Sequence, residues 1–373
     1  LRKQQELEFY EQQLKDLTKK MFFVRKDIEV IRTPIWEPYD LYSIFFRSKG
    51  KSHPGGVTEG KKSSFSKKAG MFLRGNFFIP DARKFWIKPS INYLENYLQD
   101  NKIDAIVSTG PPHSMHLIAM PLQKKFNIPW IADFRDPWTK FGFYKKLELT
   151  SFADKKHKKL EKKILETADK VITVSWSWAN DFKSITSKTN LSVITNGYDH
   201  EDFVENQNME LDNSFSITHI GSMNTDRNPK TLWKVLQQIC EENDSFKNDL
   251  SIKLYGPVDF EITNLINEAK LGNNLELHNY MPHAEVVKVM QKSQLLLLPI
   301  NNTGNLEGIL PGKLYEYIGA KRPIIAIGPK NTDAYKVISE TQAGKMFEYA
   351  DFEHLKAQIL KFCYDYKKNN LNV

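Results

Sequence analysis

Two charged side chains stand one helical turn apart in the stretch GILPGKLYEYIGAKRPIIAIG, residues 308 to 328. Lys313 and Glu316 follow a Pro-Gly turn and precede an apolar strand. Such a turn exposes the free N–H groups of a helix N-terminus, and with the lysine it favours the phosphates of a nucleotide diphosphate. The glutamate one turn later offers a carboxylate to a ribose diol. The alternative is an exposed i, i+3 ion pair, which stabilises a helix by only about 0.2–0.5 kcal/mol.

A second charged cluster follows an apolar strand in the first half of the chain, in the hexapeptide DFRDPW. Asp133 or Asp136 could orient an acceptor hydroxyl, and Arg135 could stabilise developing negative charge. The alternative is a structural salt bridge between neighbouring opposite charges. His113 and His116 follow the preceding predicted strand and could serve the same site. No third ligand stands nearby, so the pattern does not favour a metal site.

The elements that position these residues alternate between strand and helix in both halves of the chain. The first half contains a polar helix over 1–20, a strand over 27–35 and a helix near 89–99. The stretch DAIVSTGPPHSMHLIAMPLQKKF then predicts a strand, a Gly-Pro turn and a helix, and PWIADFRDPW predicts a buried strand that ends in a charged turn. A lysine-rich helix over 151–168 precedes a strand in KVITVS. After the polar stretch at 204–214 the alternation restarts, and it continues to the C-terminus.

This alternation predicts an α/β fold with two doubly wound parallel-sheet domains, residues 1–205 and 206–373. Ligands of such sheets bind beyond the carboxyl ends of the strands, so two facing domains imply a cleft between them. The chain begins inside a polar helix and not with a strand and a glycine-rich loop. We therefore expect the first domain to lack its first strand.

Composition limits the functional classes. The 373 residues contain only two cysteines, Cys240 and Cys363, and both lie in helical patterns, which indicates reduced thiols in a cytoplasmic protein. No apolar run reaches the ~20 residues that a membrane-spanning helix needs. The net charge of +8 suggests an anionic partner, but no nucleic-acid reader motif accompanies it.

Most of this charge lies in residues 61–88, which contain eight lysines and arginines against one acid. Phenylalanines and a tryptophan are interleaved with the basic residues, a composition that suits an anionic membrane surface. The hypothesis is a peripheral protein on the inner face of the plasma membrane. The alternative is a solvated loop followed by a core helix.

The order of five segments carries a family resemblance: PWIADFRDPW, ADKVITVS, VITNGYDHEDF, HIGSM followed by an arginine, and LPGKLYEYIGAKRPIIAIG. From about residue 27 to 360 the chain is similar to the GT-B glycosyltransferases of family 4, in particular to a bacterial branch with DFRDPW that acts on surface polysaccharides. The resemblance implies a retaining, metal-independent enzyme without a cofactor. It would move a sugar from a nucleotide diphosphate sugar to a lipid-linked or saccharide acceptor.

The chain departs from the family at two places. The family has a first glutamate eight residues before the position of Glu316, where it holds the transferred sugar, but here that position is Gly308 and the nearest acid is Glu307. The family also has an arginine after the glycine of its HIGSM-like turn and a lysine six residues past that glycine. Ser222 and Arg227 stand at these positions. An ordinary helix start is the alternative for this second segment.

The resemblance therefore implies two groups of site residues. Tyr280 resembles the aromatic of the loop that holds the base, although an aromatic at a strand end is more often a core residue. Alternatives to a transferase are a GT-B epimerase and a degenerate module that binds nucleotide-sugar without turnover. The implied catalytic residues are Asp133, Arg135, Asp136, His113 and His116, and the implied donor-binding residues are Gly221, Ser222, Arg227, Tyr280, Glu307, Gly308, Pro311, Gly312, Lys313, Leu314 and Glu316.

Overall fold

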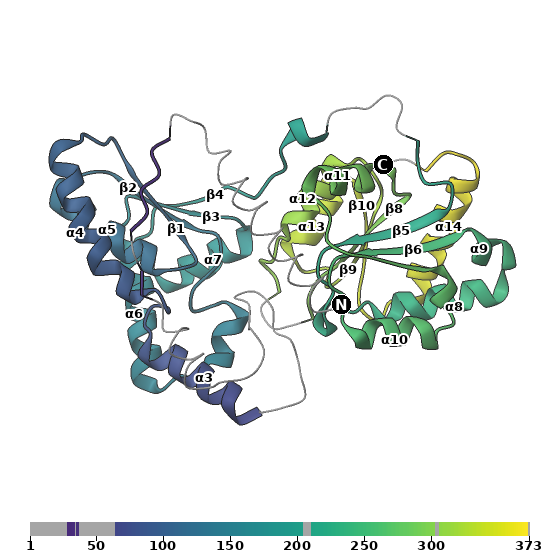
Figure 1. Cartoon of the computed structure of the whole chain (residues 1–373), viewed down its shortest axis with the longest axis horizontal. Helices are drawn as coiled ribbons and strands as arrows, with labels where there is room; N and C mark the ends of the chain where they lie inside the picture. The colour runs from purple at the N-terminus through teal and green to yellow at the C-terminus, as the bar shows by residue number, and fades with distance from the viewer. Residues whose placement is uncertain (1–27, 34, 37–63, 204–209, 303–305, 372–373) are drawn as a thin grey trace, which may run out of the picture.

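The computed structural model of the chain describes residues 28–33, 35–36, 64–203, 210–302 and 306–371. Figure 1 shows them as two α/β domains, each built around one parallel sheet. The α/β fold expected from the sequence is confirmed. The sheets are separated along the chain between Phe203 and Phe215, the interval that contains the expected boundary. Residues 204–209 of that interval lie outside the described residues.

The first domain has four described parallel strands in the order β1-β2-β3-β4. Its sheet is covered by helices that connect consecutive strands, and α3 and α4 precede the sheet along the chain (Figure 1). The elements are α3 (Ser64–Phe77), α4 (Lys84–Asp100), β1 (Ile106–Gly110), α5 (Ser114–Phe126), β2 (Trp130–Phe134), the 3-10 helix η1 (Gly142–Leu147), α6 (Ser151–Thr167), β3 (Lys170–Thr173), α7 (Trp176–Ile185), β4 (Leu191–Val193) and η2 (His200–Phe203).

The second domain has six parallel strands in the order β10-β9-β8-β5-β6-β7. The strand order reverses between β5 and β8, and such a reversal is where doubly wound sheets bind ligands. The elements are β5 (Phe215–Ile220), η3 (Thr225–Arg227), α8 (Lys230–Glu242), α9 (Asp244–Asp249), β6 (Leu250–Tyr255), α10 (Phe260–Glu268), η4 (Gly272–Asn274), β7 (Leu275–His278), α11 (His283–Lys292), β8 (Leu295–Pro299), α12 (Gly312–Gly319), β9 (Ile324–Ile327), α13 (Asp333–Thr341), β10 (Gly344–Phe347) and α14 (Phe352–Lys367).

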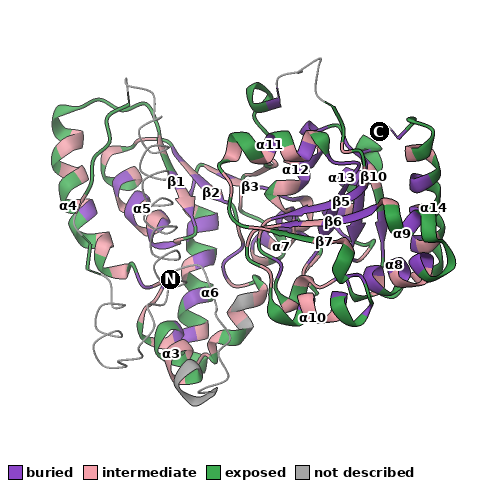
Figure 2. Ribbon diagram, turned by 45° about the vertical axis from the view of Figure 1, so that its right-hand side comes forward, coloured by how far each residue is buried: buried purple, intermediate pink, exposed green. Residues whose placement is uncertain are grey.

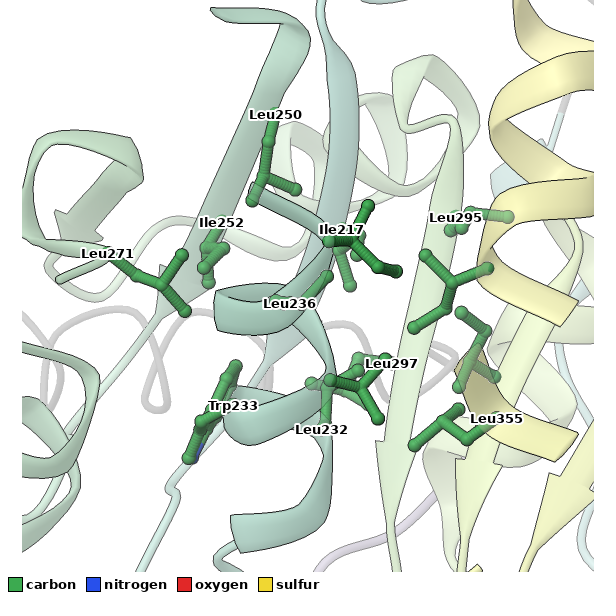
Figure 3. Close-up of a cluster of buried hydrophobic side chains, with 14 of the residues drawn as sticks. Ile217, Leu232, Trp233, Leu236, Leu250, Ile252, Leu271, Leu295, Leu297 and Leu355 are labelled. Atoms are coloured by element: carbon green, nitrogen blue, oxygen red, sulfur yellow. The ribbon is translucent and has the colours of Figure 1, made fainter. Parts of the chain in front are cut away.

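The central strands of the second domain are apolar throughout because both faces of the sheet are covered. Along β8, Leu295 and Leu297 pack into the core beneath α8 and α14, while Leu296 and Leu298 pack into the core beneath α11, α12 and α13. Figure 3 shows the first of these cores. This two-sided packing fixes the carboxyl ends of β5 and β8 relative to each other.

The strand expected over 27–35 is wrong. The described residues of that segment run without a strand along helix α4. Trp86 Nε1 on α4 donates a hydrogen bond to Thr33 Oγ1 at 2.5 Å, and Tyr97 Oη donates one to Glu29 at 3.2 Å. The described residues of this segment are thus held by side-chain hydrogen bonds to α4 and not by a strand ladder. The expected helix over 1–20 lies outside the described residues.

Helix α3 is fastened to the first domain at one end. Asn76 Oδ1 accepts hydrogen bonds from the N–H and hydroxyl of Thr150, both at 2.7 Å, and His157 Nε2 lies 3.0 Å from Gly75 O. A Cβ on Gly75 would lie 2.5 Å from Leu149 Cδ2, so the helix backbone packs closely here. Figure 2 shows α3 at the outer end of the first domain, with exposed residues along it.

Candidate functional site

The carboxyl edges of the two sheets meet at the domain interface. Helix α7 follows the carboxyl end of β3 and α13 follows the carboxyl end of β9 (Figure 1). Ser177 on α7 donates to Asp333 on α13 through its N–H at 2.8 Å and its hydroxyl at 3.1 Å. The residues that follow β1 and β2 therefore lie on an edge that turns toward the residues following β5 and β8.

Two glycines shape the carboxyl end of β5. Gly221 and Gly256 have φ of +116° and +112°, which side-chain-bearing residues rarely adopt. The two backbones nearly touch, since a Cβ on Gly256 would lie 3.1 Å from the carbonyl carbon of Gly221. Gly221 N also donates to Tyr255 O at 2.7 Å. The turn expected at Gly221 is thus held by β6 as well as by β5.

Lys313 lies across this turn. A Cβ on Gly221 would stand 2.4 Å from Lys313 Cε and 3.0 Å from its Nζ, so glycine leaves the space that the lysine occupies. Burial lowers the pKa of the Lys313 ammonium, Glu316 partly opposes this, and Arg227 lowers the pKa further. A partly desolvated cation next to a second cation is well prepared for a ligand with more than one negative charge.

Arg227 is held on the other side of the same turn. Its Nε donates to Asn301 Oδ1, and its Nη1 lies 3.4 Å from Ser222 O. Burial lowers the pKa of its guanidinium. The loop after β8 is tied to this segment by a hydrogen bond of 2.8 Å from Asn302 N to Asp226 O. Sequence reasoning missed Asn301, although its place directly after the β8 strand was a usable signal.

A buried histidine lies beneath the two cations and was not predicted. His219 on β5 is 2% exposed, and its Nδ1 lies 3.0 Å from Leu297 O. Burial lowers the pKa of His219 to about 4, so the imidazole is neutral at physiological pH and its Nδ1–H donates to the carbonyl. The site therefore keeps two positive charges and gains no third one.

Helix α12 starts where the sequence placed it, with Pro311 as the N-cap and Gly312 as the first helical residue. No side chain caps this end. Leu314 is fully buried and anchors the helix to the core, while Lys313 and Glu316 remain half-buried on the accessible side. Free N–H groups, a lysine and a carboxylate are thus presented together at the point where the strand order reverses.

The remaining donor-side residues lie farther from the cations. Tyr280 is 45% exposed and follows β7, two strands from β5, a separation of about 10 Å across the sheet. Glu307 has an exposed side chain, and its carbonyl accepts a hydrogen bond from Asp333 N at 2.8 Å. Gly308 is buried against Trp178 of the first domain.

In the first domain, Asp133 and Arg135 are fixed at the ends of β1 and β2. Thr109 Oγ1 donates to Asp133 Oδ2 at 2.8 Å across the strand pair. Arg135 donates through its N–H to Gly110 O at 3.0 Å and through Nη2 to Pro111 O at 2.8 Å, and its side chain stays exposed. Because backbone carbonyls hold the guanidinium and the side chain is exposed, the guanidinium is accessible to an incoming ligand.

Asp136 is half-buried, and the residues after it are held by a residue that sequence reasoning missed. Burial raises the pKa of the Asp136 carboxyl, and Arg135 opposes this effect. Glu161 on α6 is fully buried and accepts from the N–H groups of Trp138 at 3.1 Å and Thr139 at 3.2 Å. Burial raises the pKa of Glu161 as well. Its position four residues after buried His157 was a signal that it faces the core.

The two predicted histidines lie under the strand ends. His116 is fully buried and packs on the ring of Phe134 at 4.4 Å. Trp130 Nε1 donates to Ser108 Oγ at 2.8 Å, and Ser108 Oγ lies 2.8 Å from His116 Nδ1, a contact whose donor depends on the histidine tautomer. Burial lowers the pKa of His116 to about 3. A direct part in catalysis stays a prediction for this neutral, solvent-shielded ring.

His113 is 8% exposed and stacks on Trp138 at 4.8 Å. Burial lowers its pKa well below the ordinary value. Both His113 Nδ1 and His116 Nε2 lie within 3.0 Å of the point where a Cβ on Gly110 would stand. The two rings thus support the Gly110 turn that also binds Arg135. Among the described residues no group of three or more His, Cys, Asp or Glu is arranged to hold a metal ion.

Two family models match the chain in succession. One, described as Glycosyltransferase Family 4, matches residues 57–202, and the other, described as Glycosyl transferases group 1, matches residues 200–371. The comparison with curated proteins found no match to the chain. The two matches overlap at residues 200–202, within η2, and assign one model to each sheet.

Several solved structures are similar to the chain at low sequence identity. Sucrose-phosphate synthase from Thermosynechococcus elongatus has a TM-score of 0.55 and 16% identity over 76% of this chain and 70% of that chain. A glycosyltransferase from Rickettsia africae has a TM-score of 0.54 and 14% identity over 83% and 74%. TarM from S. aureus has a TM-score of 0.51 and 17% identity over 78% and 54%. The solved structures show the GT-B fold, and the two family models, which together match residues 57–371 with one model for each sheet, indicate a family 4-like protein of the GT-B glycosyltransferases.

Proposed function

We propose that the protein is a retaining glycosyltransferase that moves a hexosyl group from a nucleotide diphosphate sugar to a saccharide or lipid-linked acceptor. The observation that carries this proposal is the placement of Lys313 across Gly221, beside Arg227 and in front of the uncapped N-terminus of α12. These groups neutralise a leaving diphosphate without a metal ion. The similar TarM structure was solved in complex with UDP.

The first domain supplies the acceptor side of the proposed reaction. The sugar C1–O bond to the diphosphate breaks with its electron pair on the leaving phosphate oxygen, and a bond from C1 to the acceptor oxygen forms as the acceptor hydroxyl passes its proton to the carboxylate of Asp133 or Asp136. Asp133 or Asp136 orients that hydroxyl, and the exposed Arg135 guanidinium stabilises the developing negative charge. Retention of the anomeric configuration is proposed from the family likeness.

The test is a release assay with a panel of uridine, guanosine, adenosine and cytidine diphosphate sugars. We expect one of them to release nucleotide diphosphate faster when a saccharide or polyprenyl-linked acceptor is added. The rate of release should not fall when a metal chelator is present. The configuration of the product, followed by NMR, tests retention. Isomerised donor without release would identify an epimerase, and binding without either reaction would identify a module that only holds nucleotide-sugar.

The exposed side chains of α3 favour a membrane-bound acceptor. Phe72, Leu73 and Phe77 are 37%, 41% and 61% exposed on this helix, and Lys68 and Arg74 are exposed on it as well. Rings and cations together suit a peripheral contact with the anionic inner face of the plasma membrane. Lys61 and Lys62 of the predicted basic segment lie outside the described residues. No described helix is long and apolar enough to cross a membrane.

Flotation with phosphatidylglycerol vesicles tests this contact, with pure phosphatidylcholine vesicles as the reference. Wild-type protein should float with the anionic vesicles at low salt and be released as salt is added. Leu73→Ser with Phe77→Ser should reduce binding. Phe260→Ser is the matched control because Phe260 is 75% exposed in the second domain. The proposal would be contradicted if the α3 variant and the control lost vesicle binding equally, or if the wild-type protein did not bind anionic vesicles.

A further inference from the structure

The contact between α7 and α13 centres on a buried carboxylate. Asp333 is 7% exposed and accepts two hydrogen bonds from Ser177, one from the backbone N–H and one from the hydroxyl. Asp333 stands in the first turn of α13, and Ser177 stands in the first turn of α7. The carboxylate therefore lies at the positive ends of two helix dipoles that belong to different domains, which makes the contact favourable and directional.

Asp333 also holds the segment that leads into α12 and ends at its first residue, residues 306–312, which we name the donor loop. Asp333 N donates to Glu307 O at 2.8 Å. The side chain of Asp333 thus binds the first domain while its backbone binds the donor loop. Asp333 therefore connects α7 of the first domain to Glu307 of the donor loop.

A second contact reaches the donor loop directly. A Cβ on Gly308 would lie 2.2 Å from Trp178 Cδ1 and 2.4 Å from its Nε1, so the indole of α7 lies flat against the Gly308 backbone. Trp178 is 4% exposed, and its Nε1 has no hydrogen-bond partner among the described residues. The first domain therefore occupies the space that a side chain at position 308 would need.

The neighbouring residue extends this contact. Trp176, the first residue of α7, packs against the second domain's core beneath α11, α12 and α13. Lys336 Nζ on α13 lies 4.3 Å from the centre of the Trp176 ring. Two tryptophans and one carboxylate thus connect the first turn of α7 to the second domain on the side where the donor loop begins.

We propose that α7 and α13 form a latch between the two domains and that Trp178 and Asp333 are positioning residues, which fix the donor loop at the sugar end of the donor. This inference rests on the proposed function. The diphosphate end is held separately, by Lys313 across Gly221. Disturbing the latch should therefore change turnover more than nucleotide affinity.

The kinetic test uses steric compensation. Gly308→Ala places a methyl group against the indole, and we expect kcat for acceptor-dependent release to fall about 10- to 100-fold while the affinity for the nucleotide diphosphates of the panel changes less than about 3-fold. Adding Trp178→Leu, which removes the indole but stays apolar, should recover at least about tenfold in kcat. Gly197→Ala is the matched control because a Cβ there meets no atom within 4 Å. A double variant no better than Gly308→Ala would overturn the proposal.

Hydrogen exchange tests the latch even if the wild type transfers no sugar. Trp178→Leu and Ser177→Ala change only the first domain, yet amide exchange in residues 306–312 of the second domain should become several-fold faster. Gly197→Ala should leave exchange there unchanged. Unaltered exchange in the donor loop would overturn the latch, whereas altered exchange without sugar transfer in the release assay would leave the latch standing and reject the proposed function. The two failures are thus distinguishable, and neither assay depends on Gly308→Ala folding.

Discussion

The carboxyl edges of the two sheets carry different charged groups. In the second domain, two half-buried cations, Lys313 and Arg227, flank a glycine turn. In the first domain, an exposed guanidinium and a half-buried carboxylate lie at strand ends where the neutral rings of His113 and His116 support the Gly110 turn. The difference indicates that one edge is suited to a polyanion and the other to a neutral hydroxyl group. Perturbing each edge separately should therefore give different kinetic results.

The largest expected effect concerns the first domain. Asp133→Asn and Arg135→Ala should each lower turnover about 100-fold or more, because positioned proton-transfer and charge-stabilising groups contribute on this scale. Nucleotide diphosphate affinity should stay the same, since the second domain binds it. Asp104→Asn and Lys102→Ala are the controls, because these exposed residues precede β1 at the opposite edge of the sheet. A parallel loss of nucleotide affinity in the first pair would remove the distinction between the edges.

The next effect concerns Glu316. If its carboxylate binds the ribose, Glu316→Ala should weaken nucleotide binding by about 1.5–3 kcal/mol, the usual range for a hydrogen bond to a charged group. Both the nucleoside and the nucleotide diphosphate contain the ribose, so the affinity for each should fall by the same factor. Calorimetry with both ligands measures this. Unchanged affinity for both would reject the assignment.

A smaller effect is expected for Gly221→Ala. The φ of +116° is strained for alanine, and the added methyl group would stand 2.4 Å from Lys313 Cε. We expect nucleotide diphosphate affinity to fall about tenfold and unfolding free energy to fall by about 1–2 kcal/mol. Gly197→Ala, which meets open space, should do neither. Wild-type affinity in Gly221→Ala would show that the lysine does not need its place across the turn.

The smallest expected effect concerns His116 in the first domain and the pH dependence of the free energy of unfolding. The pKa of His116 falls from its ordinary 6.5 to about 3 because of burial. Between these values the unfolded chain binds a proton that the folded chain excludes, so this contribution to stability is complete above pH 6.5 and declines as pH falls, by up to about 1.4 kcal/mol per pH unit. His116→Asn should flatten the pH dependence of urea unfolding below pH 6.5. The opposite contribution of Glu161 is present in both proteins and cancels. Parallel curves would contradict the burial argument.

The local features of the second edge were predictable from the sequence because short motifs encode them. The apolar run of β8, the Pro311-Gly312 start of α12 and the spacing of Arg227 from Gly221 are all read within a few residues. The strand expected over 27–35 was wrong because an extended apolar segment can lie on a helix as well as in a sheet. Local pattern does not distinguish these two cases.

The remaining features depend on contacts between distant parts of the chain. His219 lies under the cations only because β5 and β8 are neighbours in space. Gly308 was recognised as a departure from the family pattern, but its partner Trp178 is 130 residues earlier in the chain and on another domain. Asp333 looks like an ordinary first-turn acid until α7 is placed against it. Such pairings cannot be inferred from spacing in one sequence.

Calorimetry of Lys313→Ala and Arg227→Ala with each nucleotide diphosphate and its nucleoside tests the central claim most directly, namely that the second edge binds a diphosphate. We expect the affinity for the diphosphate to fall about 10- to 100-fold and the affinity for the nucleoside to change less than about 3-fold, because only the diphosphate carries negative charge that the two cations can bind. Lys288→Ala, an exposed change on α11, should alter neither. Equal losses for diphosphate and nucleoside would contradict the account.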